Sequence, residues 1–475
     1  MPMSIFRKCC WATSSIFIVM TFGCGGSNTS STGISNPAID SVTVVCNPSG
    51  ILVTQSSQCS AILTGTGAYS IAVTWSATGG TISTSGAFIG SATGNATVTA
   101  TSTEDVSKTG SANIAVTPTG VSNFTPSSLP KWRTALSKVL SGQRRAKIAC
   151  IGDSATVGIG SYPIGFNNIK VNAWPSQLAS QLASSGIPAD SASFFADSGV
   201  GSYVSMQTAD PRITLSSDWG VNSSYVTIGG IMLANITSTS PLTFNPGITI
   251  DSADIYDYAP SSQNTWSAGF DGSYSTNPIT ALAVRKTTIT TSNGMHTVYL
   301  QPSGTGVFLI GIDAYNSTQK DIAVWNMGYA DSTTGDWAGN SNPYDPMSML
   351  AFLSPDLTII DLGIIDMGQG VSVDTFTKNM QTIITTALQS GDVIIVVPAQ
   401  VDPVYISADT QSAFRSALYS LASQYNVPVF DITQVFGDFA TANSNGLMFN
   451  ESHPDQLGYA QIAAGLAWPV SYTPH

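Results

Sequence analysis

A short apolar run followed by a polar turn stands at Lys147-Ile148-Ala149-Cys150-Ile151-Gly152-Asp153-Ser154. Comparable apolar runs recur at 321–326, 357–362, 393–397 and 427–431. Helical patterns lie at 373–389, 409–425 and 454–466. Strands that alternate with helices of this length predict a parallel sheet covered by helices on both faces. We therefore expect a flavodoxin-like three-layer α/β fold, in which Cys150 is an inert buried thiol.

Ser154 lies on the turn after the first strand, where α/β sheets bind their ligands. A neighbouring base can activate a serine hydroxyl there as a nucleophile, although Gly-Asp-Ser is also a common turn. The chain has only three histidines: His296, His453 and His475. His475 is the last residue and His296 lies outside the α/β pattern, so His453 is the candidate base. A structural histidine that caps the last helix is the alternative interpretation.

Around these two residues the sequence resembles the SGNH (GDSL-type) hydrolases, over the serine turn and about 321–470. The resemblance implies that Ser154 is the nucleophile and His453 the base. It also implies that the N–H groups of Ser154 and Gly328 form the oxyanion hole. Asp153 and Asp366 are expected to support the site.

Other positions depart from the family pattern. Ile365 stands in place of the oxyanion asparagine, Asn450 in place of the acid before the histidine, and Asp331 in place of a second glycine. Loss of one oxyanion donor costs about 2.7–4 kcal/mol. Asn450 is still able to orient the histidine ring through its oxygen, but it carries no charge. A competing position for the glycine block is Gly199-Val200-Gly201.

The N-terminus reads as an export signal over residues 1–23, with Arg7 and Lys8 before a mostly apolar stretch too short to span a bilayer. Gly23-Cys24-Gly25 resembles a bacterial lipoprotein site, which implies lipidation of Cys24 at the cell envelope. Ordinary cleavage and secretion is the alternative. A linker is expected at 24–36, and a lipid anchor is the one membrane contact predicted.

Residues 37–117 alternate apolar and polar residues with regular turns, the pattern of a β-sandwich. The segments "VTWSATGG" and "ATVTATSTEDVSKTGSANIAVTP" resemble the bacterial Ig-like (Big) family, whose domains usually act as spacers. Cys46 and Cys59 lie in adjacent strand-like runs and are able to pair after export. A linker is expected at 118–133.

The α/β domain is then expected in two parts, 134–205 and 321–475, around an inserted antiparallel β-domain at 206–320 that resembles a jelly roll. The inserted part contains aromatic residues that are able to stack on sugars, with core packing as the commoner role. These are Tyr256, Tyr258, Trp266 and Tyr315.

The composition argues against a nucleic-acid-binding protein and against a zinc site. The 475 residues carry a formal charge of -12 and only 9% charged residues, against about 25% in an average domain. No basic footprint for nucleic acid is present. No cysteine or histidine cluster has zinc-site spacing, and no cofactor is predicted.

The leading hypothesis is therefore an exported serine esterase or deacylase, acting on an esterified carbohydrate or a small ester. A catalytically weak or inactive surface protein that binds polysaccharide or a cell-surface partner is the alternative, favoured by Ile365 and Asn450. Acyl transfer through the same residues is a third reading.

Overall fold

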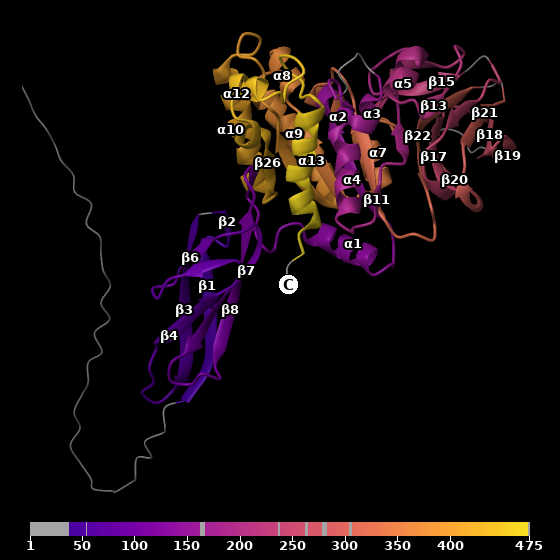
Figure 1. Ribbon diagram of the computed structural model, residues 1–475. Helices are drawn as coiled ribbons and strands as arrows, with labels where there is room; N and C mark the ends of the chain where they lie inside the picture. Colours follow the sequence, from indigo (N-terminus) through magenta and orange to yellow (C-terminus); the bar gives the residue numbers. More distant parts are fainter. Residues whose placement is uncertain are drawn as a thin grey trace, which may run out of the picture.

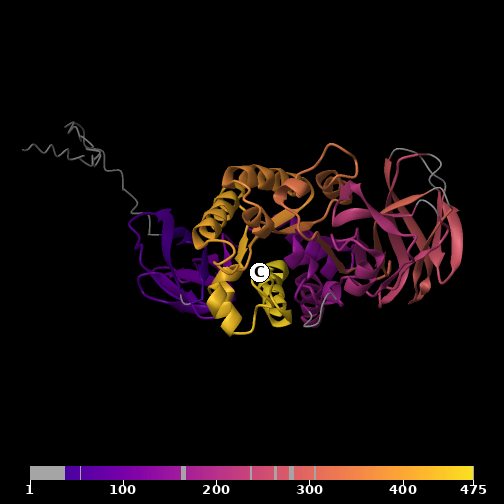
Figure 2. The ribbon, with the colours of Figure 1, turned by 90° about the horizontal axis from the view of Figure 1, so that it is seen from above.

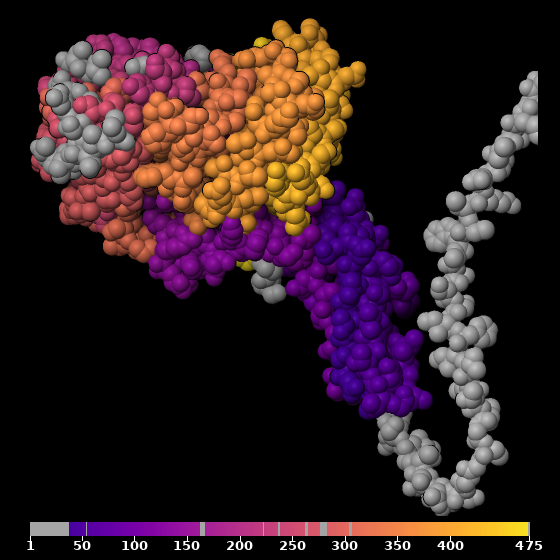
Figure 3. Space-filling model, turned by 180° about the vertical axis from the view of Figure 1, so that it is seen from behind, coloured from indigo at the N-terminus to yellow at the C-terminus, as the bar shows by residue number. Residues whose placement is uncertain are grey.

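The computed structural model describes residues 38–53, 55–161, 167–235, 238–261, 265–277, 283–303 and 306–473. The predicted export signal, Cys24 and His475 lie outside these residues. Three parts follow one another in space: an N-terminal β-sandwich, a central α/β domain and a second β-sandwich inserted into it (Figures 1 and 3).

The α/β domain is built on a seven-stranded sheet in which six strands run parallel, as the sequence predicts. Alternate residues of β10 face opposite ways, with Ile148 in one hydrophobic core and Ala149 in the other. Such strands, buried on both faces, read as continuous apolar runs. In sheet order the strands are β11 (Ala189–Asp190), β23 (Ile322–Gly328), β10 (Ala146–Gly152), β24 (Leu357–Asp361), β25 (Asp392–Val397), β26 (Val429–Asp431) and β9 (Val121–Ser122).

Helices cover both faces of this sheet and complete the three layers (Figure 2). Trp132, Leu178 and Leu466 pack on one face, from α1 (Pro130–Leu140), α4 (Trp174–Ser184) and α13 (Gln456–Ser471). The other face is covered by α7 (Pro346–Leu353), α9 (Val373–Ser390) and α10 (Ala408–Tyr425). Shorter helices are α2 (Ser154–Val157), α3 (Ile169–Asn172), α5 (Tyr203–Ala209), α6 (Thr334–Trp337), α8 (Ile364–Gly368), α11 (Ile432–Phe436) and α12 (Phe439–Ser444). Cys150 is a free, buried thiol, as expected.

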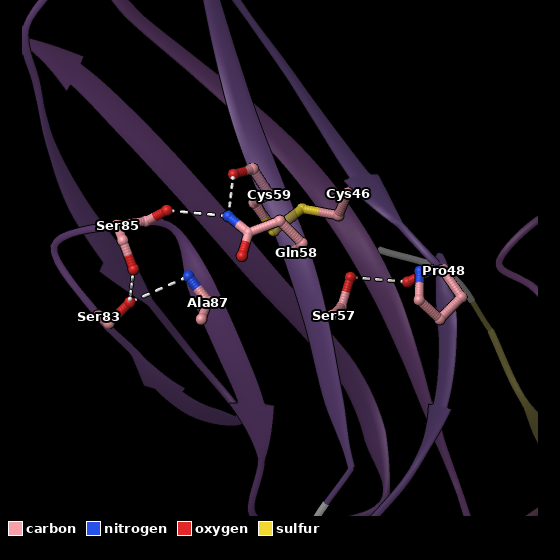
Figure 4. The surroundings of a disulfide bond; sticks show 8 residues. All are labelled: Cys46, Pro48, Ser57, Gln58, Cys59, Ser83, Ser85 and Ala87. Carbon is pink, nitrogen blue, oxygen red and sulfur yellow. Dashed lines mark hydrogen bonds between the residues drawn. A yellow bond between two sulfur atoms is a disulfide. The ribbon is translucent and has the colours of Figure 1, made fainter. Parts of the chain in front are cut away.

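The N-terminal part is a sandwich of two four-stranded sheets, in agreement with the alternating sequence pattern. Cys46 and Cys59 face each other in neighbouring strands and form the predicted disulfide (Figure 4). Membership of the bacterial Ig-like family stays a prediction. One sheet contains β1 (Ala38–Asn47), β3 (Ser56–Thr66), β6 (Ala87–Gly90) and β5 (Gly80–Ile82); the other contains β2 (Gly50–Leu52), β8 (Thr109–Thr117), β7 (Gly94–Ser102) and β4 (Val73–Ala77).

The segment expected as a linker at 118–133 is part of the α/β domain instead. Its strand β9 pairs antiparallel with β26 and closes one edge of the central sheet. The Asn123 side chain donates to the carbonyls of Ala422 and Val427, and α1 begins at Pro130. The sandwich is therefore joined to the α/β domain through paired backbone rather than a free tether.

The inserted part consists of two antiparallel sheets attached at the opposite edge of the central sheet. Its first strand, β12, precedes the expected boundary at 206. Tyr256 and Trp266 are each only 1% exposed, in agreement with core packing as the commoner role of such aromatics. Trp266 lies in the core of the insertion, and Tyr256 stacks on Phe195 in the core shared with the α/β domain. Tyr315 is half-buried beneath the Arg145 guanidinium.

One sheet of the insertion contains β14 (Gly220–Thr227), β15 (Gly230–Asn235), β22 (Val307–Tyr315), β17 (Thr249–Ala259) and β20 (Ala283–Met295), with β12 (Ser193–Phe195) on β22. The other contains β13 (Ile213–Thr214), β16 (Leu242–Phe244), β21 (Val298–Pro302), β18 (Trp266–Phe270) and β19 (Ser273–Asn277). In the described part of the chain, no helix is both long and apolar enough to cross a membrane.

Candidate active site

Ser154 lies at the tight turn from β10 into α2. The turn requires Gly152, because a Cβ there would lie 2.1 Å from Thr156 Oγ1 and 2.6 Å from the Asp361 carbonyl oxygen. Asp153 caps the short helix, its carboxylate accepting from the Ala155 N–H at 3.0 Å. The turn thus holds Ser154 at the carboxyl edge of the sheet, with 6% of its surface exposed.

His453 reaches the same edge from the loop before α13. Its Nε2 lies 2.8 Å from Ser154 Oγ, so two residues that are 299 positions apart in the chain meet as predicted. The loop is closed by the Phe449 N–H, which donates to the His453 carbonyl at 2.8 Å. The serine hydroxyl and the imidazole therefore have the contact that a nucleophile and its base need.

Asn450 fixes which nitrogen of the ring carries the proton. Its Oδ1 accepts from the N–H groups of Ser452 and His453, at 3.0 and 2.8 Å, and these two donors set the orientation of the amide. The same oxygen lies 3.0 Å from His453 Nδ1. An amide oxygen can only accept, so Nδ1 is the donor and Nε2 is free to accept the Ser154 proton. The Ser452 hydroxyl, 3.1 Å from Nδ1, is a second contact that the sequence did not predict.

Burial lowers the pKa of His453, while the negative charges of Glu451 and Asp331 act in the opposite direction and only partly offset it. Because a general base must be neutral, kcat/KM should rise with pH along a limb whose midpoint lies below the ordinary histidine value of about 6.5.

Initial rates with a soluble ester between about pH 4.5 and 8 measure this limb. The Asn450→Asp variant places a carboxylate against Nδ1, which stabilises the imidazolium and moves the midpoint upward by about one unit. A wild-type midpoint above 7, or no change in the variant, contradicts the assignment.

The glycine block at the end of β23 lies directly beside the serine turn. Gly152 of β10 pairs with Gly328, and a Cβ on Gly328 would lie 2.3 Å from the Val157 nitrogen. However, the Gly328 N–H donates to Asn326 Oδ1 at 3.1 Å. The predicted oxyanion donor is thus already engaged, and this glycine is needed for the close approach of α2. Asp331 follows with a left-handed φ of 58°.

The competing block lies one step further from the serine. Ser198, next to Gly199, accepts from the Ala330 N–H at 2.9 Å. The loop that contains Gly199 is therefore bonded to the segment after β23 and not to β10. The placement at Gly328 is the one that the sheet order favours.

The segment in which Ile365 replaces the oxyanion asparagine follows β24, the neighbour of β10 on its other side. Ile365 is half-buried on α8 and supplies no polar atom. Asp366 is fully buried and accepts from the N–H and hydroxyl of Thr334, the latter at 2.6 Å. Its supporting role is therefore to anchor α6 on α8.

A buried carboxyl pair, missed from the sequence, lies beneath the nucleophile. Burial and the neighbouring Asp361 raise the pKa of Asp153 well above its ordinary range. Burial also raises the pKa of Asp361 to about 6. Both shifts arise because the two carboxyl groups are buried next to each other behind the serine turn. The sequence feature that could have revealed this pair is Asp361, a charged residue at the end of the apolar run 357–360.

The remaining candidates lie elsewhere. His296 contacts Asp271 in the inserted sandwich, with 2.6 Å between Nδ1 and a carboxylate oxygen. Among the described residues, no group of three or more histidine, cysteine or acidic side chains is placed to hold a metal ion.

Known proteins share parts of this architecture. Residues 312–461 match the model of the GDSL-like Lipase/Acylhydrolase family. A peptidoglycan O-acetylesterase structure aligns with a TM-score of 0.55 at 16% identity, over 73% of this chain and 97% of that one. A putative lipolytic protein of the G-D-S-L family from Desulfitobacterium hafniense aligns with a TM-score of 0.27 at 21% identity, over 32% of this chain and 82% of that one.

No curated protein sequence matches the chain. The family model covers less than half of the chain, and at such low identity the structural likeness shows the fold alone. The domain that carries Ser154 and His453 therefore has the fold of the GDSL-like hydrolases.

Proposed function

We propose that the protein is an exported serine esterase that removes acyl groups from a carbohydrate, with Ser154 as nucleophile and His453 as base. One observation carries the proposal: Ser154 Oγ lies 2.8 Å from a histidine nitrogen that is set to accept its proton. Asn450 holds the ring in place of the usual acid.

The reaction proceeds in two steps. Ser154 Oγ attacks the ester carbonyl carbon while its proton moves to His453 Nε2. The ester C–O bond then breaks, and the leaving alcohol takes that proton. Water next attacks the acyl-enzyme, gives its proton to Nε2, and releases the acid as Ser154 regains its hydrogen. Glu451 and Asp331 supply the negative field that the neutral Asn450 lacks at the imidazolium.

The oxyanion is assigned to two backbone donors, the N–H groups of Ser154 and Asp331. Neither N–H makes a backbone hydrogen bond within the described part of the chain. The Asp331 N–H replaces that of Gly328, which is bound to Asn326. Ile365 adds no third donor, so the site is expected to work below the rate of a complete oxyanion hole.

The substrate class follows from the fold and from the predicted export. The shared fold with a peptidoglycan O-acetylesterase and the predicted export signal both favour an acylated polysaccharide outside the cytoplasm. Lipidation at Cys24 would hold the enzyme at the envelope. Transfer of the acyl group to a second sugar uses the same residues and differs in the acceptor.

A fluorophosphonate probe tests the nucleophile, because it reacts with serines that have an activated hydroxyl. We expect stoichiometric labelling of the intact protein, with the added mass on the peptide that contains Ser154, and turnover of p-nitrophenyl acetate that falls in parallel. A folded protein that is not labelled, or is labelled at another serine, would indicate a binding protein instead.

A further inference from the structure

Asp331 lies on the segment that follows β23, beside the serine turn. Tyr329, two residues earlier, donates its N–H to the Gly152 carbonyl at 2.9 Å, which ties this segment to the serine turn. Asp331 itself has a left-handed φ of 58° and an exposed side chain. Glycine would adopt this backbone without strain, so the fold does not require a carboxylate here.

The two charged side chains that act on His453, those of Asp331 and Glu451, are both negative. Asp331 and Glu451 act on His453 and raise its pKa, and the Asp331 charge also acts on Asp153. No described lysine or arginine contributes to the field at His453. Lys170 is buried behind β23, where it donates to the Asn326 carbonyl at 3.3 Å. An exposed carboxylate, on a segment bonded to the serine turn, therefore acts on His453 without an opposing lysine or arginine among the described residues.

This arrangement has opposite consequences for different esters. The carbonyl oxygen becomes negative when Ser154 attacks, and a nearby carboxylate repels that charge in proportion to its proximity. With a neutral ester the carboxylate repels the oxyanion alone. With an anionic ester it also repels the charge that the substrate carries. An ester that carries an ammonium group attracts the carboxylate and screens it from the oxyanion.

We propose that Asp331 selects esters that carry a positive charge close to the reacting carbonyl. This proposal rests on the esterase function and narrows its substrate. The ammonium group belongs either to the alcohol, as in an ester of an amino sugar or amino alcohol, or to the acyl group, as in an aminoacyl ester. Both place a cation within reach of one carboxylate.

Two pairs of esters with matched shape separate charge from fit. Acetylcholine and 3,3-dimethylbutyl acetate differ in a charge on the alcohol side. Betaine methyl ester and methyl 3,3-dimethylbutanoate differ in the same charge on the acyl side. The ratio of kcat/KM within each pair is compared between the wild-type protein and Asp331→Asn. Asparagine tolerates a left-handed φ, so the backbone is kept. Asp409→Asn, an exposed change in the first turn of α10, controls for net charge.

In at least one pair we expect the preference for the cationic ester to fall about tenfold in Asp331→Asn, corresponding to about 1.4 kcal/mol, and to stay unchanged in Asp409→Asn. The pair that responds identifies the side that carries the charge. Ratios that are equal in wild type and Asp331→Asn, with p-nitrophenyl acetate still hydrolysed, overturn the selection and leave the esterase intact. A wild-type protein without activity on any of these esters overturns both.

Discussion

Ser154→Ala is expected to lower kcat for p-nitrophenyl acetate by a factor on the order of 10⁴–10⁶, close to the rate without protein. The hydroxyl that lies 2.8 Å from His453 Nε2 is the atom proposed to bond to the acyl group, and no other hydroxyl of the described residues contacts that nitrogen. The kcat of His453→Gln should fall by a similar factor, because glutamine cannot accept the serine proton. The kcat of the double variant should be no lower than that of either single variant, since both residues act in one step.

Ser452→Ala is the matched control for this measurement. It removes a neighbouring hydroxyl that touches the other ring nitrogen, Nδ1, and leaves the Asn450 contact in place. Its kcat should stay within about tenfold of wild type, as expected for an orienting contact that has a substitute. Thermal unfolding of all variants checks that they are folded. An unchanged rate in Ser154→Ala would exclude the proposed nucleophile.

The contact between Ser154 and His453 was predictable because two local signals, each weak alone, supported each other and the resemblance to the SGNH hydrolases. Ser154 follows an apolar strand at the edge where parallel sheets bind ligands, and scarcity left His453 as the candidate base for the α/β domain. The Asn450 contact also follows from spacing, since a side-chain oxygen three residues before the histidine readily accepts from the backbone of its own loop. The alternation of strands and helices likewise predicted the central sheet.

The errors arose where the outcome depends on tertiary contacts. Sequence cannot show that Asn326 folds back on the Gly328 N–H and so removes the expected oxyanion donor. A strand as short as β9 has no periodicity to detect, and the central sheet recruits it only through pairing with β26. The sequence also does not show which core buries each aromatic residue of the insertion. Trp266 lies in the core of the insertion, whereas Tyr256 packs with Phe195 and Trp325 in the core shared with the α/β domain.

Ile365→Asn is expected to raise kcat by about tenfold or more. Loss of one oxyanion donor costs about 2.7–4 kcal/mol, a factor on the order of 10²–10³, which sets the upper limit of the gain. Ile365 is half-buried on α8, directly after the strand next to β10, so an amide at this position lies at the same edge as Ser154. It also packs outside the buried clusters, so the exchange should leave the core intact.

The gain must come from the amide donor and not from lost bulk, and two variants separate these causes. Ile365→Val trims the side chain without adding a donor and should leave kcat nearly unchanged. Ile365→Asn combined with Ser154→Ala should be as inactive as Ser154→Ala alone, because an oxyanion donor has no function without an attacking oxygen. If Ile365→Asn gives no gain while Ser154 remains reactive to a fluorophosphonate, the oxyanion is bound away from α8. The N–H groups of Ser154 and Asp331 then stabilise the oxyanion without a donor at position 365.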